Sequence, residues 1–271
     1  MKLSELLENN GEASQVEIVG LSADSREVRP GYLYAALRGS RQDGTAFIDD
    51  AVSQGAVAVL APPGVRIASP NAYLVTDVNP RRRLSYLAAR FFGAQPETVV
   101  AVTGTNGKSS VVEFARQIWT SLGRKAASLG TLGVHGNGLD RQGSMTTPDP
   151  VTLHNMLKDL EDEGVGCLAM EASSHGLSQF RLDGVRLAAA AFTNLSRDHL
   201  DYHESYEEYL YAKLRLFGEL LPPHSHAILN ADSDAFEDVA NICWARGHRI
   251  LSVGKKGDLR LRSQEPTAIG Q

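Results

Sequence analysis

Short, strongly apolar runs alternate with longer amphipathic segments from about residue 98 onward. VVAVT, GCLAM, LAAAAF and HAILN are examples, and none shows the polar–apolar alternation of a half-exposed strand. Runs this apolar are typical of parallel strands that are buried on both faces, because the connecting helices cover the sheet. The sequence therefore predicts an α/β fold with a mostly parallel sheet and helices on both of its faces.

The residues before about position 94 predict a smaller α/β unit of their own. The runs GYLYAAL and AYLVTDV resemble strands, and the segment after them has clear helix boundaries. Asn79 can cap that helix, Pro80 suits its first turn and Gly93 can end it. A chain of 271 residues is long enough to bury two hydrophobic cores. We therefore expect an N-terminal domain over residues 1–94 and a second, phosphate-loop-type domain over residues 95–271.

Three consecutive arginines, Arg81 to Arg83, fall in the first turn of the predicted helix. The N-terminus of a helix carries a partial positive charge, so cations are disfavoured there. Two interpretations stay open for these arginines: a solvated charged face, or a contact with an anionic ligand.

Composition excludes several classes of protein. The net charge of −5 argues against a general nucleic-acid binder, and no apolar run is as long as a membrane span. The acidic start MKLSELLENNGEAS lacks the features of a signal peptide. Cys167 and Cys243 lie far apart within apolar patterns, which predicts buried free thiols and neither a disulfide nor a zinc site. We expect a cytoplasmic monomer.

The segment VVAVTGTNGKSSVVEF joins an apolar strand to a helix through a glycine turn. The usual phosphate loop is G-x-x-x-x-G-K-[ST], whereas Val102 stands five residues before Gly107. The turn glycines let backbone amides approach an anion, and the helix N-terminus adds its positive end. Lys108 can reach terminal phosphates and Ser109 can bind Mg²⁺. A plain glycine turn with an exposed lysine is the alternative, but the position between strand and helix favours phosphate binding.

Polar residues follow two later apolar runs, and the carboxyl ends of parallel strands are where ligands bind. Glu171 follows GCLAM; its carboxylate suits Mg²⁺ or a bound water, although a solvent-facing residue at a strand end is the alternative. TNLSRDHLDYH follows AAAAF and contains His199 and His203 at helical spacing. Leu200 replaces the glutamate of the H-E-x-x-H zinc motif, so we favour magnesium or nucleotide contacts, or helix capping, over a zinc protease.

Lys213 lies within YEEYLYAKLRLF, where its helical neighbours are apolar or aromatic. A lysine in such a position usually buries its stem and extends its amine to solvent. The alternative is a desolvated amine with a lowered pKa, which would be available for covalent chemistry.

Five ordered motifs together resemble the Mur ligases of peptidoglycan synthesis. They are TGTNGKSS, TTPDP, MEASSHGLSQFR, TNLSRDHLDYH and YAKLRLF, and LSADSREVRPGYLYAALRGSRQDG resembles the UDP-sugar-binding domain of the same family. The motifs are most similar to the MurE type, which adds the third peptide residue to UDP-N-acetylmuramoyl-L-alanyl-D-glutamate. The resemblance implies an ATP- and Mg²⁺-dependent ligase that activates a carboxylate as an acyl phosphate, with this UDP-sugar dipeptide and an amino acid as its substrates.

The resemblance also implies roles for particular residues. The residues expected to bind ATP are Gly104, Thr105, Asn106, Gly107, Lys108, Ser109 and Ser110. The residues expected to contact the UDP-muramoyl dipeptide are Ala23, Ser25, Ser40, Arg41, Gln42, Thr146, Thr147, Ser173, Gln179 and Arg181. Mg²⁺ would be held by Ser109, Glu171, His199 and Lys213, the last as the N6-carboxylysine that forms with CO₂. The expected catalytic residues are Lys108, Glu171, His199 and Lys213.

The incoming amino acid and the activity of this chain are less well defined. meso-Diaminopimelate is expected from the MurE type, although no segment matches the motif that selects it. Family members continue into a domain that binds the amino acid, whereas this chain stops at TAIGQ, so we expect little ligase activity from it alone. Two alternatives stay open: another Mur or folylpolyglutamate-type ligase, and a protein that binds nucleotide or UDP-sugar without turnover.

Overall fold

The computed structural model describes residues 1–8, 15–39, 42–136, 138, 140–141, 145–196, 202–203 and 205–263. The chain divides into two compact units. The first comprises Met1–Ala94, Asp149–Asp159 and Gln179–Gly184, and the second comprises Gln95–Pro148, Leu160–Ser178 and Val185–Gln271. Two segments from the middle of the chain therefore belong to the first unit.

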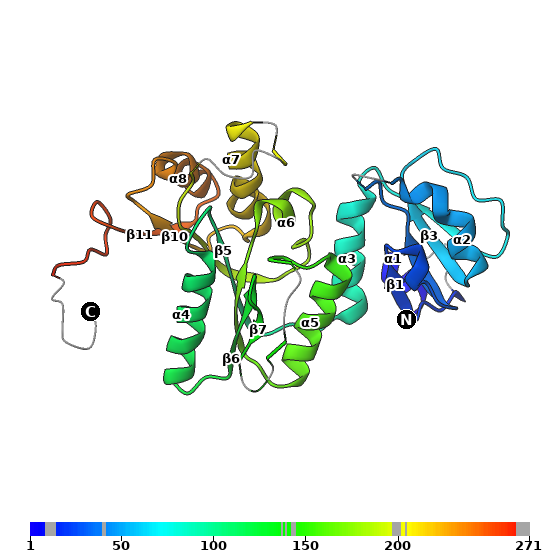
Figure 1. The fold of residues 1–271 in the computed structure, drawn as a ribbon, viewed down its shortest axis with the longest axis horizontal. Helices are drawn as coiled ribbons and strands as arrows, with labels where there is room; N and C mark the ends of the chain where they lie inside the picture. Colours follow the sequence, from blue (N-terminus) through cyan, green and yellow to red (C-terminus); the bar gives the residue numbers. More distant parts are fainter. Residues whose placement is uncertain are drawn as a thin grey trace. The chain divides into compact units, whose positions relative to one another are not determined.

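A four-stranded parallel sheet in the order β1-β2-β3-β4 forms the centre of the first unit (Figure 1). The strands are β1 (Gly20–Ser22), β2 (Tyr32–Ala35), β3 (Ala56–Ala61) and β4 (Tyr73–Thr76). The helices are α1 (Leu3–Leu7), α2 (Ile48–Ser53) and α3 (Pro80–Phe92), with 3₁₀ turns at Ser25–Glu27 and Gly44–Phe47. Leu33 and Leu60 pack with Leu84 of α3 in one core, whereas Tyr34 and Val59 lie in a second core with α2.

Helix α3 begins and ends where its sequence predicts. The Asn79 side chain accepts a hydrogen bond from the backbone N–H of Arg82 at 3.0 Å, which caps the helix. Pro80 occupies the first turn, and Gly93 follows the last turn with φ +75°. These boundaries are local features, so the sequence alone is enough to place them.

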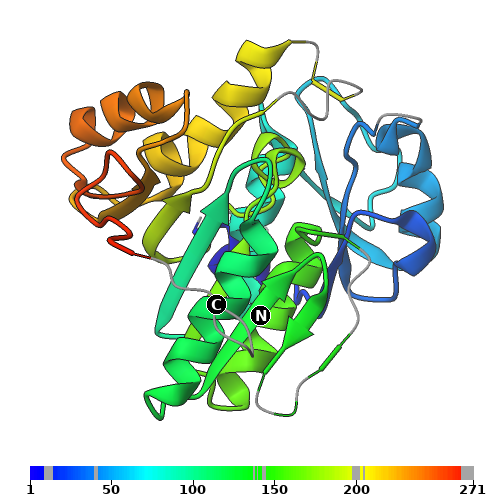
Figure 2. The same cartoon turned by 60° about the vertical axis from the view of Figure 1, so that its left-hand side comes forward.

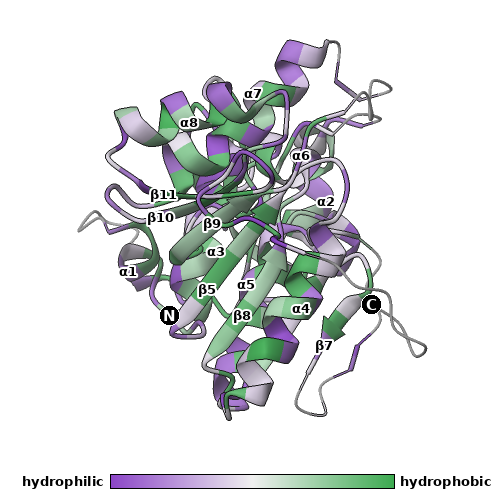
Figure 3. Cartoon of the chain, turned by 90° about the vertical axis from the view of Figure 1, so that its left-hand side faces the viewer, coloured by the Kyte–Doolittle hydropathy of each residue, from purple (hydrophilic) through white to green (hydrophobic). Residues whose placement is uncertain are grey.

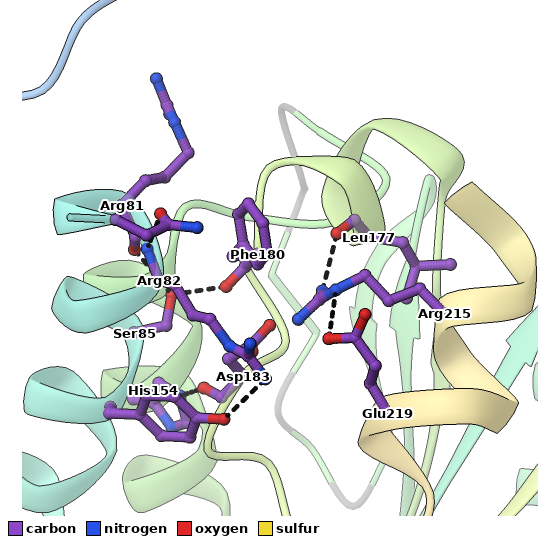
Figure 4. A network of polar contacts seen from close by, with 11 residues as sticks. Arg81, Arg82, Ser85, His154, Leu177, Phe180, Asp183, Arg215 and Glu219 are labelled. Atoms are coloured by element: carbon purple, nitrogen blue, oxygen red, sulfur yellow. Dashed lines mark hydrogen bonds and ion pairs between the residues drawn. The ribbon is translucent and has the colours of Figure 1, made fainter. Parts of the chain in front are cut away.

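The arginines at the start of α3 bind partners within the first unit. Arg82 Nε donates to Asp183 Oδ1 at 2.8 Å, and the Asp183 side chain is fully buried (Figure 4). Arg81 Nη2 donates to the Arg38 carbonyl at 2.6 Å, and Arg83 Nη2 donates to a carbonyl of the α1 helix at 3.2 Å. These hydrogen bonds give the three arginines a structural role within the first unit. Neither of the two sequence-based interpretations, a solvated charged face or a contact with an anionic ligand, included this role.

The second unit contains a seven-stranded sheet in the order β11-β10-β9-β5-β8-β6-β7, with only β7 antiparallel to its neighbour. This arrangement confirms the predicted fold class. The strands are β5 (Thr98–Thr103), β6 (Ala126–Gly130), β7 (Gly133–His135), β8 (Cys167–Glu171), β9 (Leu187–Phe192), β10 (His226–Asn230) and β11 (Arg249–Val253). Figure 3 shows β5 and β8 as largely hydrophobic, as expected for buried central strands.

Helices cover both faces of this second sheet. α4 (Lys108–Ser121) packs on one face, where Val112 meets Val102 and Ala191, and Figure 2 shows it as a blue-green helix along the sheet. α8 (Phe236–Ala245) packs against β10 and β11. The β5-α4-β6 and β10-α8-β11 crossovers run in opposite directions along the sheet, so right-handed connections place α4 and α8 on opposite faces.

Three further helices are α5 (Pro150–Asp162), α6 (Ser174–Ser178) and α7 (Tyr206–Arg215), and a π-helical turn over Leu216–Leu220 follows α7. Arg215 Nη1 donates to the Leu177 carbonyl at 2.8 Å, which ties the end of α7 to α6 (Figure 4).

Cys167 and Cys243 are buried free thiols, as predicted. Within the described ranges, every helix is too short or too polar to cross a membrane.

Candidate functional site

The phosphate loop connects the end of β5 to the start of α4. Gly104 has φ +146° and Gly107 has φ +85°, which are backbone conformations that favour glycine. A Cβ built on Gly104 would lie only 1.9 Å from Thr193 Oγ1, so space also requires glycine there. α4 has 14 residues, and its N-terminus directs backbone amides and a positive dipole end into this loop. The geometry favours binding of an anion.

Lys108 folds back over the loop that precedes it. Its Nζ donates to the carbonyls of Gly104 and Thr105 at 3.0 and 2.9 Å. The ammonium group therefore lies against the glycine turn and does not extend away from it. Ser110, by contrast, is exposed on the first turn of α4.

Glu171 is buried at the end of β8, with 1% of its surface exposed. Its Oε1 accepts hydrogen bonds from Ser109 Oγ and from the backbone N–H of Thr131, both at 2.8 Å. A Cβ on Gly130 would lie 2.1 Å from the same oxygen, so a glycine makes room for the carboxylate. The carboxylate is thus not a solvent-facing strand end. Carboxylate and hydroxyl oxygens this close together form a donor set suited to Mg²⁺.

Three of the residues predicted to contact the UDP-muramoyl dipeptide lie in the hydrogen-bond network around Glu171. Thr147 Oγ1 donates to the Glu171 carbonyl at 3.1 Å, and it accepts from the Ser173 hydroxyl at 3.0 Å. The Thr146 hydroxyl lies 2.9 Å from the Thr131 hydroxyl, which itself bonds to the Glu171 side chain. Segments that are separate in sequence therefore meet at one edge of the sheet.

Lys213 reaches the same loop from α7. Only 2% of its surface is exposed, and its Nζ donates to the Gly104 carbonyl at 2.9 Å. The Nζ also lies 4.3 Å from the centre of the Tyr209 ring. The amine does not extend to solvent, so of the two sequence-based alternatives the structure favours the desolvated amine.

Thr193 and Asn194 are loop contacts that sequence reasoning did not single out. Thr193 Oγ1 donates to the Asn106 carbonyl at 2.7 Å. Asn194 Oδ1 accepts from the Asn106 N–H at 2.9 Å, and its backbone carbonyl accepts from the Thr105 N–H at 2.9 Å. Both residues directly follow β9, which pairs with β5, so the rule that ligands bind at strand carboxyl ends could have found them.

Three of the predicted UDP-muramoyl contacts, Ala23, Ser25 and Gln42, follow neighbouring strands of the first sheet. Ala23 and Ser25 follow β1, and Gln42 lies in the loop after the neighbouring parallel strand β2. The Asp24 side chain caps the turn at Ser25, and its hydrogen bond to Arg26 lowers the pKa of the Asp24 carboxyl. Both segments therefore lie at the carboxyl ends of adjacent parallel strands.

Other predicted residues fall elsewhere. Gln179 and Arg181 belong to the first unit, where Arg181 Nη2 donates to Gln179 Oε1 at 2.7 Å. Ser40, Arg41 and His199 lie outside the described residues. The predicted roles of all these residues stay predictions.

Comparison with known proteins gives matches over both units. The chain matches the Mur ligase middle domain over residues 102–267 and the Mur ligase family catalytic domain over residues 17–92. It is 51% identical over 267 residues to the UDP-N-acetylmuramoyl-L-alanyl-D-glutamate–2,6-diaminopimelate ligase of Rhizobium meliloti, covering 95% of this chain and 55% of that relative. The ligase of the same name from Caulobacter vibrioides is 49% identical, with 100% and 57% covered.

The chain thus spans about half the length of the curated relatives it matches. A solved structure of a UDP-N-acetylmuramoyl-L-alanyl-D-glutamate–2,6-diaminopimelate ligase superposes with a TM-score of 0.86 at 28% identity, covering 100% of this chain and 56% of that one. A MurF ligase from Thermotoga maritima, solved in complex with ADP, shares the fold at a TM-score of 0.58 and 23% identity, with 88% and 51% covered. The motifs, the two matched domains and the fold agree, and the chain belongs to the Mur ligase family.

Proposed function

We propose that this chain carries the nucleotide site and the UDP-muramoyl dipeptide site of a cytoplasmic, ATP-dependent ligase. The ligase would add the third residue, meso-diaminopimelate, to UDP-N-acetylmuramoyl-L-alanyl-D-glutamate. The observation that carries the proposal is the meeting of Lys108 and Lys213 at the Gly104 carbonyl, beside the hydrogen-bonded pair of Ser109 and Glu171. The names of the curated relatives support the choice of substrates.

The residues of the loop fit a polyphosphate and its magnesium ion. The amides at the N-terminus of α4 would hold phosphate oxygens, and Lys108 would offset their negative charge, whereas the Thr105 and Asn106 amides donate to Asn194. Ser109 and Glu171 would hold Mg²⁺, with Lys213 as a further ligand in the carboxylated form that the resemblance implies. When bound, ATP supplies the phosphoryl group that activates a carboxylate toward an amine. Burial of Glu171 and Lys213 limits the access of water to this region.

Titration calorimetry with the purified chain tests the two sites separately. We expect ADP with Mg²⁺ to bind, and Lys108→Ala to weaken that binding at least tenfold through the loss of one positive charge on the phosphates. We expect UDP-N-acetylmuramoyl-L-alanyl-D-glutamate to bind with or without nucleotide. The proposal would be refuted if the unmodified chain did not bind ADP with Mg²⁺, or if it did not bind the UDP-muramoyl dipeptide.

ADP release then distinguishes the candidate functions. The assay compares the UDP-muramoyl dipeptide, the corresponding tripeptide and a folate as acceptors. Stimulation by the dipeptide supports the proposed ligase, whereas a response only to the tripeptide or the folate supports a related ligase. Binding of both ligands without ADP release supports a chain that binds without turnover.

A further inference from the structure

Thr105 differs from its neighbours in the phosphate loop because its side chain points into the protein. Only 6% of Thr105 is exposed, whereas Asn106 and Gly107 are exposed. A phosphate loop binds its anion through backbone amides, so anion binding by itself does not require a side chain at this position. The Thr105 hydroxyl is nevertheless well occupied: it lies 3.0 Å from the Tyr209 hydroxyl and accepts a hydrogen bond from the Ser196 N–H at 3.0 Å.

Tyr209 is the residue that brings α7 to this hydroxyl. It is fully buried and lies one helical turn before Lys213, so the two side chains project from the same face of α7. Lys213 Nζ lies 4.3 Å from the Tyr209 ring centre and donates to the carbonyl of Gly104. α7 therefore holds two consecutive loop residues: Gly104 through Lys213, and Thr105 through Tyr209.

We propose that the Thr105–Tyr209 hydrogen bond is a positioning contact that couples the phosphate loop to Lys213. A hydrogen bond between buried groups is directional, and breaking it leaves polar groups without compensation from water. A shift of the loop around a bound polyphosphate therefore changes the position of Tyr209, and with it the surroundings of the Lys213 amine. The inference rests on the proposed nucleotide site and goes further by naming two side chains whose hydroxyls meet inside the protein.

A double-mutant cycle tests the coupling on the purified chain. Thr105→Val and Tyr209→Phe each remove one hydroxyl with little change of shape, and calorimetry measures the affinity for ADP with Mg²⁺. We expect each variant to bind roughly 3- to 10-fold more weakly, because each loses the hydrogen bond between the two hydroxyls; Thr105→Val also removes the acceptor of the Ser196 N–H. The double variant should bind no more weakly than the weaker single variant, since the second change removes nothing more. Thr105→Ser keeps the hydroxyl and should restore the affinity.

Tyr211→Phe is the matched control, because Tyr211 lies on the same helix and is 68% exposed. Its affinity for ADP should equal that of the unmodified chain. Melting temperatures of all variants show whether each is folded before the affinities are compared. The coupling would be overturned if Thr105→Val, Tyr209→Phe and the unmodified chain bound ADP with equal affinity. It would also be overturned if the loss of ADP affinity in the double variant equalled the product of the two single losses.

A second measurement follows Lys213 itself. An amine-selective acylating reagent labels Lys213 only when its buried amine becomes accessible, and mass spectrometry quantifies this modification with and without saturating ADP and Mg²⁺. In the unmodified chain, ADP should change this labelling; in Thr105→Val and Tyr209→Phe the change should disappear at saturation. An undiminished response in both variants would refute the coupling alone. Failure of the unmodified chain to bind ADP would instead refute the nucleotide site and the coupling with it.

Discussion

Replacement of Gly104 by alanine is expected to destabilise the second unit by about 1.5–4.5 kcal/mol. The backbone φ of +146° is unfavourable for any residue with a side chain, at a cost of about 1–3 kcal/mol. The added Cβ would also lie 1.9 Å from Thr193 Oγ1 and 3.0 Å from the backbone of Asn194. Thr193 must therefore move and lose its 2.7 Å bond to the Asn106 carbonyl, which adds about 0.5–1.5 kcal/mol.

Gly123→Ala separates backbone strain from this clash. Gly123 has φ +77°, and no atom lies within 4 Å of a Cβ built there, so we expect a loss of only about 1–2 kcal/mol. Chemical denaturation at 25 °C gives both free energies of unfolding, and calorimetry gives the affinity for ADP with Mg²⁺. Gly104→Ala should also lose ADP binding, whereas Gly123→Ala should keep it. Equal destabilisation by the two changes, together with normal ADP binding by Gly104→Ala, would refute the reasoning.

Two further predictions concern charged side chains. Arg116 hydrogen bonds hold the pKa of Glu113 at about 2, below its usual 4.5, so the carboxylate stabilises the fold above pH 4.5 and this stabilisation is lost as the pH falls towards 2. Glu113→Gln should therefore lower the free energy of unfolding by about 1–3 kcal/mol at pH 7 and by almost nothing at pH 2, as measured by denaturation at both pH values. Glu163→Gln is the control at an exposed position and should change the free energy of unfolding little at either pH. In the first unit, Asp183→Asn should lower the free energy of unfolding by about 1–3 kcal/mol, because Arg82 loses its buried carboxylate partner; an unchanged melting temperature would show that the pair contributes nothing.

Much of the fold could be predicted because its signals are local. The strand Thr98–Thr103 and the limits of α3 were placed correctly from apolar runs and capping residues. Ser205 caps α7, since its side chain accepts from the Glu208 N–H at 3.1 Å, and serine at such a position is a local helix-start signal. Several short elements were not predicted, among them α1, β1, α6 and β7, which adds an antiparallel edge to the second sheet. Short segments of this kind carry little periodic signal.

Sequence alone determined the family, the α/β class and the glycine turn between β5 and α4, because motif spacing and strand–helix alternation lie within short stretches of chain. Only the tertiary structure decided what those motifs touch. Lys213 bonds to a carbonyl 109 residues away, and Thr105 meets Tyr209 across 104 residues. Likewise, Arg82 binds Asp183 across 101 residues. Contacts of this kind depend on how strands are ordered in a sheet and on which face each helix packs, and no local pattern of residues encodes either property.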